Sequence, residues 1–430
     1  MLCLFFFSPP FNTIFFMFTS TFASATAQHH IDLEEKYGAH NYHPLPVVLE
    51  RGEGVFLWDV DGKRYYDFLS GYSAVNQGHC HPVIVQALIE QAQQLTLTSR
   101  AFHSNLLGEY AQFITHCFGY DKVLPMNTGV EAVETALKLA RRWGYAVKGI
   151  EDNKAKIIVC AENFHGRTGT VISFSTDPAS YAGFGPYMPG FQVIPYNDLT
   201  ALAAALQDKQ VAGFLMEPIQ GEAGVVVPDE GYLAKAKQYC EDANVLFIAD
   251  EIQTGLCRTG RMLACDHENV RPDILILGKA LSGGVLPVSA VLADDAIMLT
   301  IHAGEHGSTY GGNPLACKVA LAALNVLLNE NMAANADAMG ALFRNKLAAL
   351  QSPYIKTIRG KGLLNAIVVA HPDKEAAWNL CLALKENGLL AKPTHGDKVR
   401  FAPPLNITAE QVEECVGIIG RSLSVLGQVR

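Results

Sequence analysis

Short apolar runs, each bounded by polar turns, recur through the middle of the chain and constrain its fold more than any other feature. They are "KIIVC" (156–160), "AGFLMEPI" (212–219), "VLFIAD" (245–250), "DILILG" (273–278) and "PVSAVLA" (287–293). Runs that are apolar on both faces predict strands of a parallel sheet covered by helices on both sides. Stretches of helical spacing alternate with them, which is typical of βαβ units. We therefore expect an α/β protein with a mostly parallel sheet sandwiched by helices.

The pattern changes at both ends of this central region. Residues 40–75 read as turns and short strands, and the Asp61-Gly62 turn predicts a hairpin. Inside the central region, "AVETALKLARRWG" has helical spacing and is expected to end at Gly144. The predicted divisions are an N-terminal segment (28–75), a large domain (76–315) and a smaller α+β domain (316–430).

The last of these divisions opens with a long helical stretch, "NPLACKVALAALNVLLNE". A strand is expected over 355–369, followed by a helix that ends at Gly388. Thr408 and Gln411 form a capping box, which predicts the start of a final helix. This mixture of strand and helix is why we expect the smaller domain to be α+β.

Composition excludes several classes of partner and site. The chain has 430 residues and a net charge of −9, which argues against nucleic acid, since phosphate binding needs a basic surface. With 49% hydrophobic and 17% charged residues, the composition is that of a globular protein with a large core. The ten cysteines are scattered without a C-x-x-C spacing, which argues against common zinc motifs and a disulfide framework. A reducing compartment is the expected location.

Residues 1–27 differ from the rest of the chain. They are rich in phenylalanine and contain no lysine or arginine, whereas secretory and mitochondrial leaders need positive charge. Pro9 and Pro10 interrupt the apolar stretch, and the pieces on either side are too short to span a membrane. We interpret this segment as a start codon assigned too early, with ordered protein beginning near His29 and a cytoplasmic location. An atypical leader, with a mitochondrial matrix location, is the alternative.

Two glycine-containing segments have the composition of anion-binding loops. In "NTGVEAVETALKLARRWG" (127–144), Thr128 and Glu131 can form a capping box, and the backbone must be approached closely at Gly129. Free amides at a helix start bind phosphate, although an ordinary capped helix has the same signature. The second segment, "EHGSTYGGNP" (305–314), carries two hydroxyls. It lacks the spacing of a P-loop and is also compatible with a flexible surface loop.

Two charged residues end apolar strands in the central region. Asp250, followed by Glu251, ends "FIAD", and Lys279 ends "LILG". Singly they are compatible with a helix N-cap and a lysine that extends to solvent. Their spacing fits a strand, a crossover and the next strand, so both can face one cleft. A phosphate site, a strand-end aspartate and a strand-end lysine are the parts that pyridoxal phosphate requires.

These segments resemble the signature of the class-III pyridoxal-phosphate aminotransferases. The resemblance is carried by "FIADEIQTGLCRTG" and "PDILILGKALSGG" and extends from about Glu34 to the C-terminus. Other matching stretches are "KYGAHNYHPLPVVLERG", "GYSAVNQGHCHP", "MNTGVEAVETA", "EPIQGEAGVVVPD" and "GEHGSTYGGNP". The resemblance implies a fold-type I homodimer whose active site is shared between subunits.

Within the family, the chain is most similar to members that act on L-ornithine. Such enzymes transfer the δ-amino group to 2-oxoglutarate, which yields L-glutamate and glutamate 5-semialdehyde. The semialdehyde cyclises to pyrroline-5-carboxylate, a step of proline biosynthesis and arginine metabolism. The alternatives are an acetylornithine or 4-aminobutyrate aminotransferase and, from a different class, a non-catalytic protein that binds the same cofactor.

The resemblance also implies which residues hold the cofactor. Lys279 would bond it covalently and later move a proton, and Asp250 would keep its pyridine nitrogen protonated so that the ring accepts negative charge. The remaining contacts would come from Gln253 on the phenolic oxygen, Phe164 on the ring face, the amides of Gly129 and Val130 on the phosphate, and Thr309 of the neighbouring subunit.

The substrate residues follow from the same resemblance. Tyr42 and Arg167 would bind the carboxylate end of ornithine, and Tyr72 would line the site. Glu222 and Arg400 correspond to the pair that governs selectivity in the family.

Two further positions carry expectations of their own. His165 stands where related enzymes have tryptophan, and we expect it to change packing at the pocket rim without changing the reaction. The histidines of "GHCHP" (78–82) are expected to diverge too much to share a metal, so no metal site is predicted.

Overall fold

The computed structural model describes residues 24–427, which form three sheets and their covering helices. The central sheet has seven strands in the order β4-β10-β9-β8-β7-β5-β6. Their bounds are Lys122–Met126 (β4), Lys156–Cys160 (β5), Phe191–Ile194 (β6), Val211–Met216 (β7), Leu246–Asp250 (β8), Ile274–Leu277 (β9) and Ser289–Ala293 (β10). The five strands predicted from apolar runs are all present, whereas β4 and β6 were not predicted.

The central sheet is mostly parallel, as predicted, and one strand runs in the opposite direction. Strands β6, β5, β7, β8 and β9 run parallel, but β10 pairs antiparallel with both β9 and β4. Only residues 278–288 join β9 to β10. A parallel crossover needs a dozen residues or more, usually including a helix, so this short connection returns the chain in the opposite direction.

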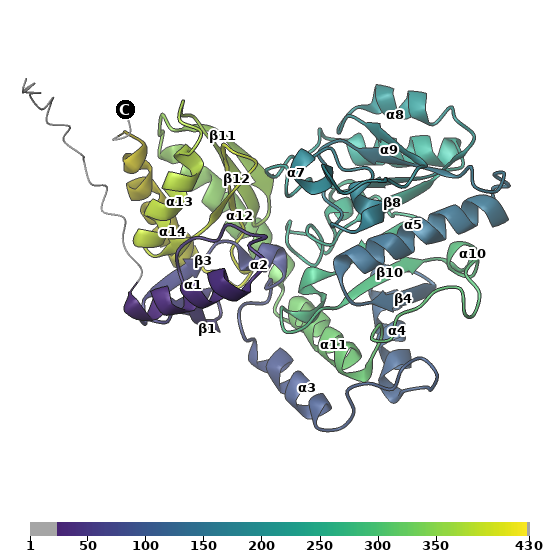
Figure 1. Ribbon diagram of the computed structural model, residues 1–430, viewed down its shortest axis with the longest axis horizontal. Helices are drawn as coiled ribbons and strands as arrows, with labels where there is room; N and C mark the ends of the chain where they lie inside the picture. The colour runs from purple at the N-terminus through teal and green to yellow at the C-terminus, as the bar shows by residue number, and fades with distance from the viewer. Residues whose placement is uncertain (1–23, 428–430) are drawn as a thin grey trace, which may run out of the picture.

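Helices cover both faces of the central sheet. On one face, α5 (Gly129–Ala146) packs in a core that includes Ile157, whereas the next residue, Ile158, points to the opposite core. On that second face lie α8 (Leu199–Ala205) and α9 (Tyr232–Asp242). Figure 1 shows α5 on one side of the sheet and α8 and α9 on the other. The arrangement is the predicted three-layer sandwich.

Helix α5 begins as predicted and ends later than predicted. Thr128 and Glu131 form the expected capping box. Gly144 lies inside the helix, which continues to Ala146. A Cβ added at Gly144 would approach the Cβ of Ala212 on β7 to 2.9 Å. Glycine is therefore used here for close packing of the helix on the sheet, and it does not mark the helix end.

Two four-stranded sheets form the rest of the framework. One contains β1 (Leu49–Glu53), β2 (Phe56–Asp59), β3 (Arg64–Asp67) and β13 (Leu389–Leu390); the other contains β11 (Ile355–Lys361), β12 (Leu364–Val369), β15 (Lys398–Phe401) and β14 (Lys392–Thr394). The predicted hairpin joins β2 and β3. Because β13 pairs with β3, the N-terminal segment lies against the C-terminal part of the chain, as the purple and yellow elements of Figure 1 show.

The segment 355–369, predicted as one strand, is a hairpin. Strands β11 and β12 pair antiparallel and turn at Gly362, whose φ is 52°. The helix α13 (Ala376–Glu386) ends just before Gly388, which has a φ of 88°, and α14 (Ala409–Ser422) starts at the predicted capping box. The predictions for these two helices are confirmed.

The remaining helices surround the sheets. They are α1 (Ala25–Tyr37), α2 (Ser70–Ser73), α3 (Pro82–Ala92), α4 (Asn105–Phe118), α6 (Gly169–Ile172), α7 (Pro178–Tyr181), α10 (Asp295–Met298), α11 (Pro314–Asn329) and α12 (Met332–Ala349), with 3₁₀ turns η1 (Ala264–Glu268), η2 (Lys279–Ser282) and η3 (Leu423–Gly427). In residues 24–427, none of the helices is long and apolar enough to cross a membrane.

Most of the leader predicted over residues 1–27 lies outside the described residues. Its last residues are described, and there α1 begins at Ala25, before the predicted start of order at His29. The helix begins here because the Ser24 hydroxyl accepts a hydrogen bond from the amide of Ala27 at 3.0 Å.

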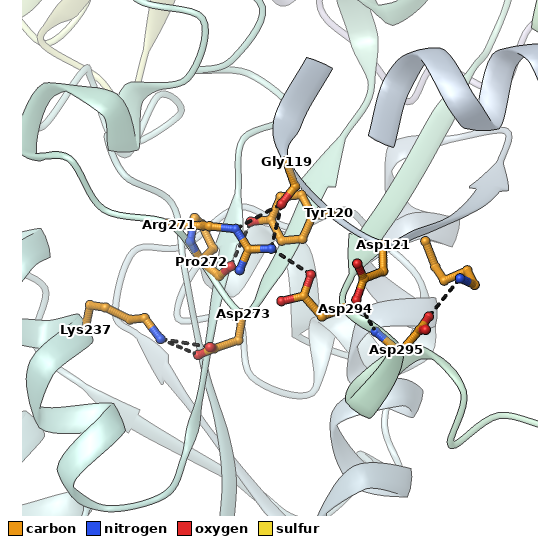
Figure 2. Close-up of polar contacts among 10 residues, drawn as sticks. Gly119, Tyr120, Asp121, Lys237, Arg271, Pro272, Asp273, Asp294 and Asp295 are labelled. Carbon is orange, nitrogen blue, oxygen red and sulfur yellow. Dashed lines mark hydrogen bonds and ion pairs between the residues drawn. The ribbon is translucent and has the colours of Figure 1, made fainter. Parts of the chain in front are cut away.

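Figure 2 shows a polar network around Arg271. It lies at the end of the central sheet where β9 begins, opposite the end where Asp250 closes β8 and Lys279 follows β9. The guanidinium of Arg271 donates to the carbonyl of Gly119, just before β4, at 2.7 Å. It also pairs with Asp294, just after β10, at 2.7 Å and lies 4.1 Å from the ring centroid of Tyr120. These contacts connect the starts of β4 and β9 with the end of β10.

Candidate active site

A cavity of about 200 Å³ lies where the carboxyl ends of β7, β8 and β9 meet the start of α5. Ligands in open α/β sheets bind in this position. The cavity is lined by Gly129, Val130, Phe164, His165, Gly166, Glu217, Asp250, Ile252, Gln253, Thr254 and Lys279. The structure therefore brings together six of the predicted cofactor residues: Gly129, Val130, Phe164, Asp250, Gln253 and Lys279.

Lys279 follows β9 directly and opens the η2 turn. Its φ is 45°, a left-handed conformation that non-glycine residues seldom adopt outside functional or strained sites. Its amine has no hydrogen-bond or ion-pair partner among the described residues. Burial lowers the pKa of Lys279, against the opposing effect of Glu222 and Asp250. A partnerless amine with a lowered pKa suits covalent chemistry better than a structural ion pair.

Asp250 is the last residue of β8 and is held by a buried histidine. Its Oδ2 lies 2.6 Å from Nδ1 of His165, and its Oδ1 accepts the amide of Ile252 at 3.1 Å. The prediction that His165 only alters packing at the pocket rim is wrong, because its side chain is fully buried behind the acid. Although burial opposes protonation, Asp250 and Glu217 raise the pKa of His165. The second ring nitrogen, Nε2, has no partner.

The start of α5 offers free amides to the cavity. Thr128 and Glu131 cap the helix, and within the described residues the amides of Gly129 and Val130 donate to no acceptor. A Cβ at Gly129 would come within 3.0 Å of Ile252, so glycine lets the start of α5 lie close to Ile252 without a clash. Two unpaired amides at a helix N-terminus are the geometry of a phosphate site.

Glu217 is a cavity residue that the sequence reasoning missed. It follows β7, and its Oε2 accepts the amide of Phe164 at 3.0 Å. Burial raises the pKa of Glu217 to about 7, with Asp250 adding to the effect and His165 opposing it. An acid just after a fully apolar strand was the available signal, the same one that identified Asp250.

A second cluster adjoins the cavity and contains the predicted selectivity pair. Nη1 of Arg400 lies 2.7 Å from Oε1 of Glu222. The amide of Gln253 bridges them, because its Nε2 donates to Glu222 at 3.1 Å and its Oε1 accepts from Arg400 at 3.3 Å. Burial opposes ionisation of Glu222, but Arg400 and Lys279 lower its pKa to about 2. Tyr72 closes the cluster, with its ring centroid 5.2 Å from the Arg400 guanidinium.

Three predicted residues belong neither to the cavity lining nor to the second cluster. Arg167 is exposed, and its guanidinium lies 5.8 Å from the ring centroid of Phe164. Tyr42 is exposed on the N-terminal segment and lies near Lys392. Thr309 is exposed in the loop before α11. None of the three is therefore placed on the cofactor cavity of its own subunit.

The two histidines of "GHCHP" contact different acids. Nε2 of His79 lies 2.6 Å from Asp67, and Nε2 of His81 lies 2.9 Å from Glu330. Across residues 24–427, no group of three or more His, Cys, Asp or Glu side chains is placed to hold a metal.

The cavity fits the predicted cofactor on the evidence of its own atoms. The partnerless amine of Lys279 can bond an aldehyde, and the free amides of α5 can take a phosphate. Between them, the Asp250 carboxylate is oriented by His165 and suited to a protonated pyridine nitrogen.

Comparison with known proteins agrees with this geometry. The model of the class-III aminotransferases matches residues 37–423. The mitochondrial ornithine aminotransferase of Rattus norvegicus is 63% identical over 398 residues, 93% of this chain and 91% of the rat protein.

Two solved structures also resemble the chain closely. The ornithine aminotransferase of Toxoplasma gondii, crystallised with oxidised glutathione and containing pyridoxal phosphate at partial occupancy, superposes with a TM-score of 0.92 at 50% identity, covering 94% of this chain and 95% of that one. The acetylornithine aminotransferase of Elizabethkingia anophelis gives a TM-score of 0.85 at 59% identity, with coverages of 93% and 99%. On the family match and these relatives, the chain belongs to the class-III aminotransferases.

Proposed function

We propose that this pyridoxal-phosphate-dependent enzyme is an ornithine aminotransferase. It would transfer the δ-amino group of L-ornithine to 2-oxoglutarate and release glutamate 5-semialdehyde and L-glutamate. The observation that carries the proposal is the Glu222–Arg400 ion pair, 2.7 Å long and adjacent to the Lys279 cavity. The identity of 63% to the rat ornithine aminotransferase supports it.

When bound, pyridoxal phosphate supplies an electron sink for the carbon that loses a proton. Lys279 would hold the cofactor at rest and then carry the proton at the reacting carbon, for which a lowered pKa is suited. Asp250 would keep a negative charge opposite the pyridine nitrogen, and His165 fixes the orientation of that carboxylate. Glu217 holds the backbone of Phe164, whose ring lines the same cavity.

The ion pair answers a problem that the two substrates create. Glutamate reacts at its α-amine and needs a cation for the adjacent carboxylate, whereas ornithine has no carboxylate beside its δ-amine. Arg400 would bind the glutamate carboxylate, and Glu222 would neutralise Arg400 while ornithine reacts. Thr394 donates to the backbone carbonyl of Glu222 at 2.6 Å, so the side chain can turn while its backbone stays in place. Arg167 and Tyr42 would bind the distal carboxylate.

The exposed position of Thr309 supports a shared site. A residue that is outside its own cavity can reach the phosphate of a second copy, and we propose a homodimer in which Thr309 does so. Division of the chain into an N-terminal segment (28–75), a large domain (76–315) and a small domain (316–430) remains a proposal. The pairing of β3 with β13 links the first of these to the last.

The substrate test uses the absorbance of the purified holoenzyme. L-Ornithine, N-acetylornithine and 4-aminobutyrate are added separately without 2-oxoglutarate, and the cofactor band is followed in a stopped-flow instrument. Rapid bleaching by ornithine, with formation of pyrroline-5-carboxylate, is the expected result. Rapid bleaching by one of the other amines, with a slow response to ornithine, would contradict the proposal.

One observation favours a second candidate, an acetylornithine aminotransferase. The Elizabethkingia anophelis enzyme of that name is 59% identical over 93% of this chain. The two activities differ at the α-nitrogen, which is cationic in ornithine and a neutral amide in N-acetylornithine. The ratio of the two bleaching rates therefore separates them directly.

The compartment stays a prediction, namely the cytoplasm, with the mitochondrial matrix as the alternative. Some of the relatives are named as mitochondrial, and the names of others carry no compartment. Residues 1–30 can be fused to a fluorescent protein and the fusion imaged in cells. Its location in the cytoplasm or in mitochondria distinguishes the two predictions.

A further inference from the structure

The segment that carries Tyr72 has a left-handed backbone. Ser70, Gly71, Tyr72 and Ser73 have consecutive φ values of 50°, 54°, 61° and 71°. The turn is closed by a hydrogen bond of 2.8 Å from the amide of Ala74 to the carbonyl of Ser70. Left-handed helical geometry is unfavourable for L-residues, because Cβ comes too close to the following carbonyl oxygen. Since three of the four residues are not glycine, surrounding contacts must impose this conformation.

A buried carboxylate supplies those contacts at the start of the turn. Oδ1 of Asp67 accepts the amides of Leu69 and Ser70 at 2.8 and 2.9 Å, and the side chain is almost fully buried. Its Oδ2 lies 2.6 Å from Nε2 of His79. The backbone of His79 is paired with Gly54 by hydrogen bonds of 2.8 and 3.0 Å. One oxygen of Asp67 thus holds the turn, and the other is fixed by an anchored ring.

The residues after the turn connect it to both parts of the active site. Asn76 accepts a hydrogen bond from the fully buried Arg258 at 3.1 Å, and Arg258 also donates to the carbonyl of Pro403 at 2.6 Å. The side chain of Gln77 donates to the carbonyl of Ala280 at 3.0 Å, next to Lys279. The turn is therefore held between the strand of Arg400 and the turn of the cofactor lysine.

The side chain that the turn presents is Tyr72, which faces the selectivity pair. Its ring centroid lies 5.2 Å from the Arg400 guanidinium. Burial and Glu222 raise the pKa of the Tyr72 hydroxyl, while Arg400 opposes the effect. A cation beside an aromatic ring is attracted by the charge distribution of the ring, and more strongly when both are desolvated. The position of Tyr72 therefore affects how readily Arg400 leaves Glu222 for a substrate carboxylate.

We propose that Asp67, oriented by His79, is a positioning residue that sets substrate selectivity by holding the left-handed turn and thereby placing Tyr72 against Arg400. Asp67 touches neither substrate nor cofactor and acts through Tyr72. The proposal deepens the proposed function and rests on it. It gives the Asp67–His79 pair a role in the reaction that an ordinary buried hydrogen-bonded pair would not have.

The test is a double-mutant cycle on the holoenzyme with Asp67→Ala and Tyr72→Ala. Single-turnover rate constants are measured separately with L-ornithine and L-glutamate, and the affinity for glutarate, an unreactive dicarboxylate, is measured by calorimetry. Asp67→Ala and Tyr72→Ala should each lower the ornithine-to-glutamate ratio about tenfold and change glutarate affinity in the same direction. The double variant should match Tyr72→Ala, because residues acting through one side chain are not additive.

Asp59→Ala is the matched control. Asp59 is also buried, accepts two backbone amides (Asp61 and Lys63) and bonds one side chain (Tyr65), but it holds the β2–β3 hairpin. This variant should lower stability while leaving the substrate ratio and glutarate affinity at wild-type values. Asp67→Asn, which keeps an acceptor for the two amides, should restore most of the ratio.

Each remaining outcome decides the question. If wild type does not react with ornithine, the proposed function fails. If wild type reacts, the positioning role is overturned when Asp67→Ala keeps the wild-type ratio, when Tyr72→Ala does, or when their effects add. Should Asp67→Ala not fold, His79→Asn removes only the group that orients the carboxylate, and the same tests apply with a shift of several-fold.

Discussion

Lys279 combines an unusual backbone with an unpaired amine among the described residues, and both features suit the covalent role proposed for it. Its φ is 45°, the residue lines the cavity, and its amine has no partner among the described residues. Lys279→Ala should remove the covalent link to the cofactor. Borohydride treatment followed by peptide mass spectrometry should find the reduced cofactor on Lys279 in wild type and on no peptide of the variant. A labelled peptide from another lysine would refute the assignment.

Glu217 is expected to make stability depend on pH. Burial raises its pKa from 4.5 to about 7, so the folded protein binds a proton that the unfolded chain has lost. Stability therefore falls as the pH rises from 4.5 to 7, by about 3 kcal/mol, with the full penalty present above pH 7. Glu217→Gln should flatten this dependence. Urea unfolding of the cofactor-free protein at pH 4.5 and 7.5 measures it, and parallel losses in both proteins would contradict the prediction.

At the scale of elements, the strands of the central sheet carry different groups at their two ends. The cavity residues lie at the carboxyl ends of β7, β8 and β9, and the network around Arg271 lies at the opposite end of the sheet (Figure 2). Arg271→Ala should lower the free energy of unfolding by about 1–2 kcal/mol, since it removes hydrogen bonds to Gly119 as well as the ion pair with Asp294. Denaturant titrations measure this loss, and transamination rates should not change.

An exposed ion pair at the same end of the central sheet provides a matched control. Lys122 pairs with Asp295 at 2.8 Å, and both side chains are about half exposed. Lys122→Ala should lower stability less than Arg271→Ala does, because exposed ion pairs contribute little. If the two variants lose equal stability, the hydrogen bonds from Arg271 to the Gly119 carbonyl add nothing to the free energy of unfolding.

The elements also show what the sequence could and could not predict. Strands apolar on both faces, such as β5 and β8, were recognisable, as were helix starts marked by a capping box. The helix α12 was not predicted, because its two asparagines and Gly340 interrupt the apolar spacing. Tertiary packing supplies its stability: Phe343 and Leu347 are buried against the core.

For the site, the reactive residues at strand ends could be predicted, but contacts between residues far apart in the sequence could not. Asp250 and Lys279 follow apolar runs, so they were identified with the cleft. The contact of His165 with Asp250 joins residues far apart in sequence, and periodicity carries no information on such pairs. The left-handed turn at Tyr72 was also missed, since three of its residues are not glycine.

At the scale of the whole molecule, the proposed selectivity pair joins the segment after a strand of the central sheet to a strand of a smaller sheet. Glu222 lies beyond the end of β7, whereas Arg400 lies on β15. Glu222→Ala should free Arg400, which could then bind ornithine's own α-carboxylate and present the α-amine. A difference of about 1.4 kcal/mol in relative binding changes the product ratio tenfold. Single-turnover product analysis, scoring pyrroline-5-carboxylate against the α-keto product, measures the change.

The same variant separates a gate from a fixed ion pair. Glu222→Ala should keep or increase the rate with glutamate, because Arg400 no longer has to leave an internal partner. Glu222→Gln retains a group for Gln253 but loses the charge, and we expect an intermediate product ratio. Unchanged δ-selectivity together with an unchanged glutamate rate would show that the pair is structural.

The placement of Tyr72 and Arg400 outside the central sheet has a consequence for how such an enzyme can diversify. The residues proposed to hold the cofactor line the cavity at the strand ends of the central sheet, whereas Tyr72 lies in the turn after β3 and Arg400 on β15 of the smaller sheets. Exchange of residues 67–79 and 398–401 between relatives would alter the choice of amine and leave the electron sink intact. New substrates can therefore be acquired by recombining short segments, with no need to rebuild the catalytic centre.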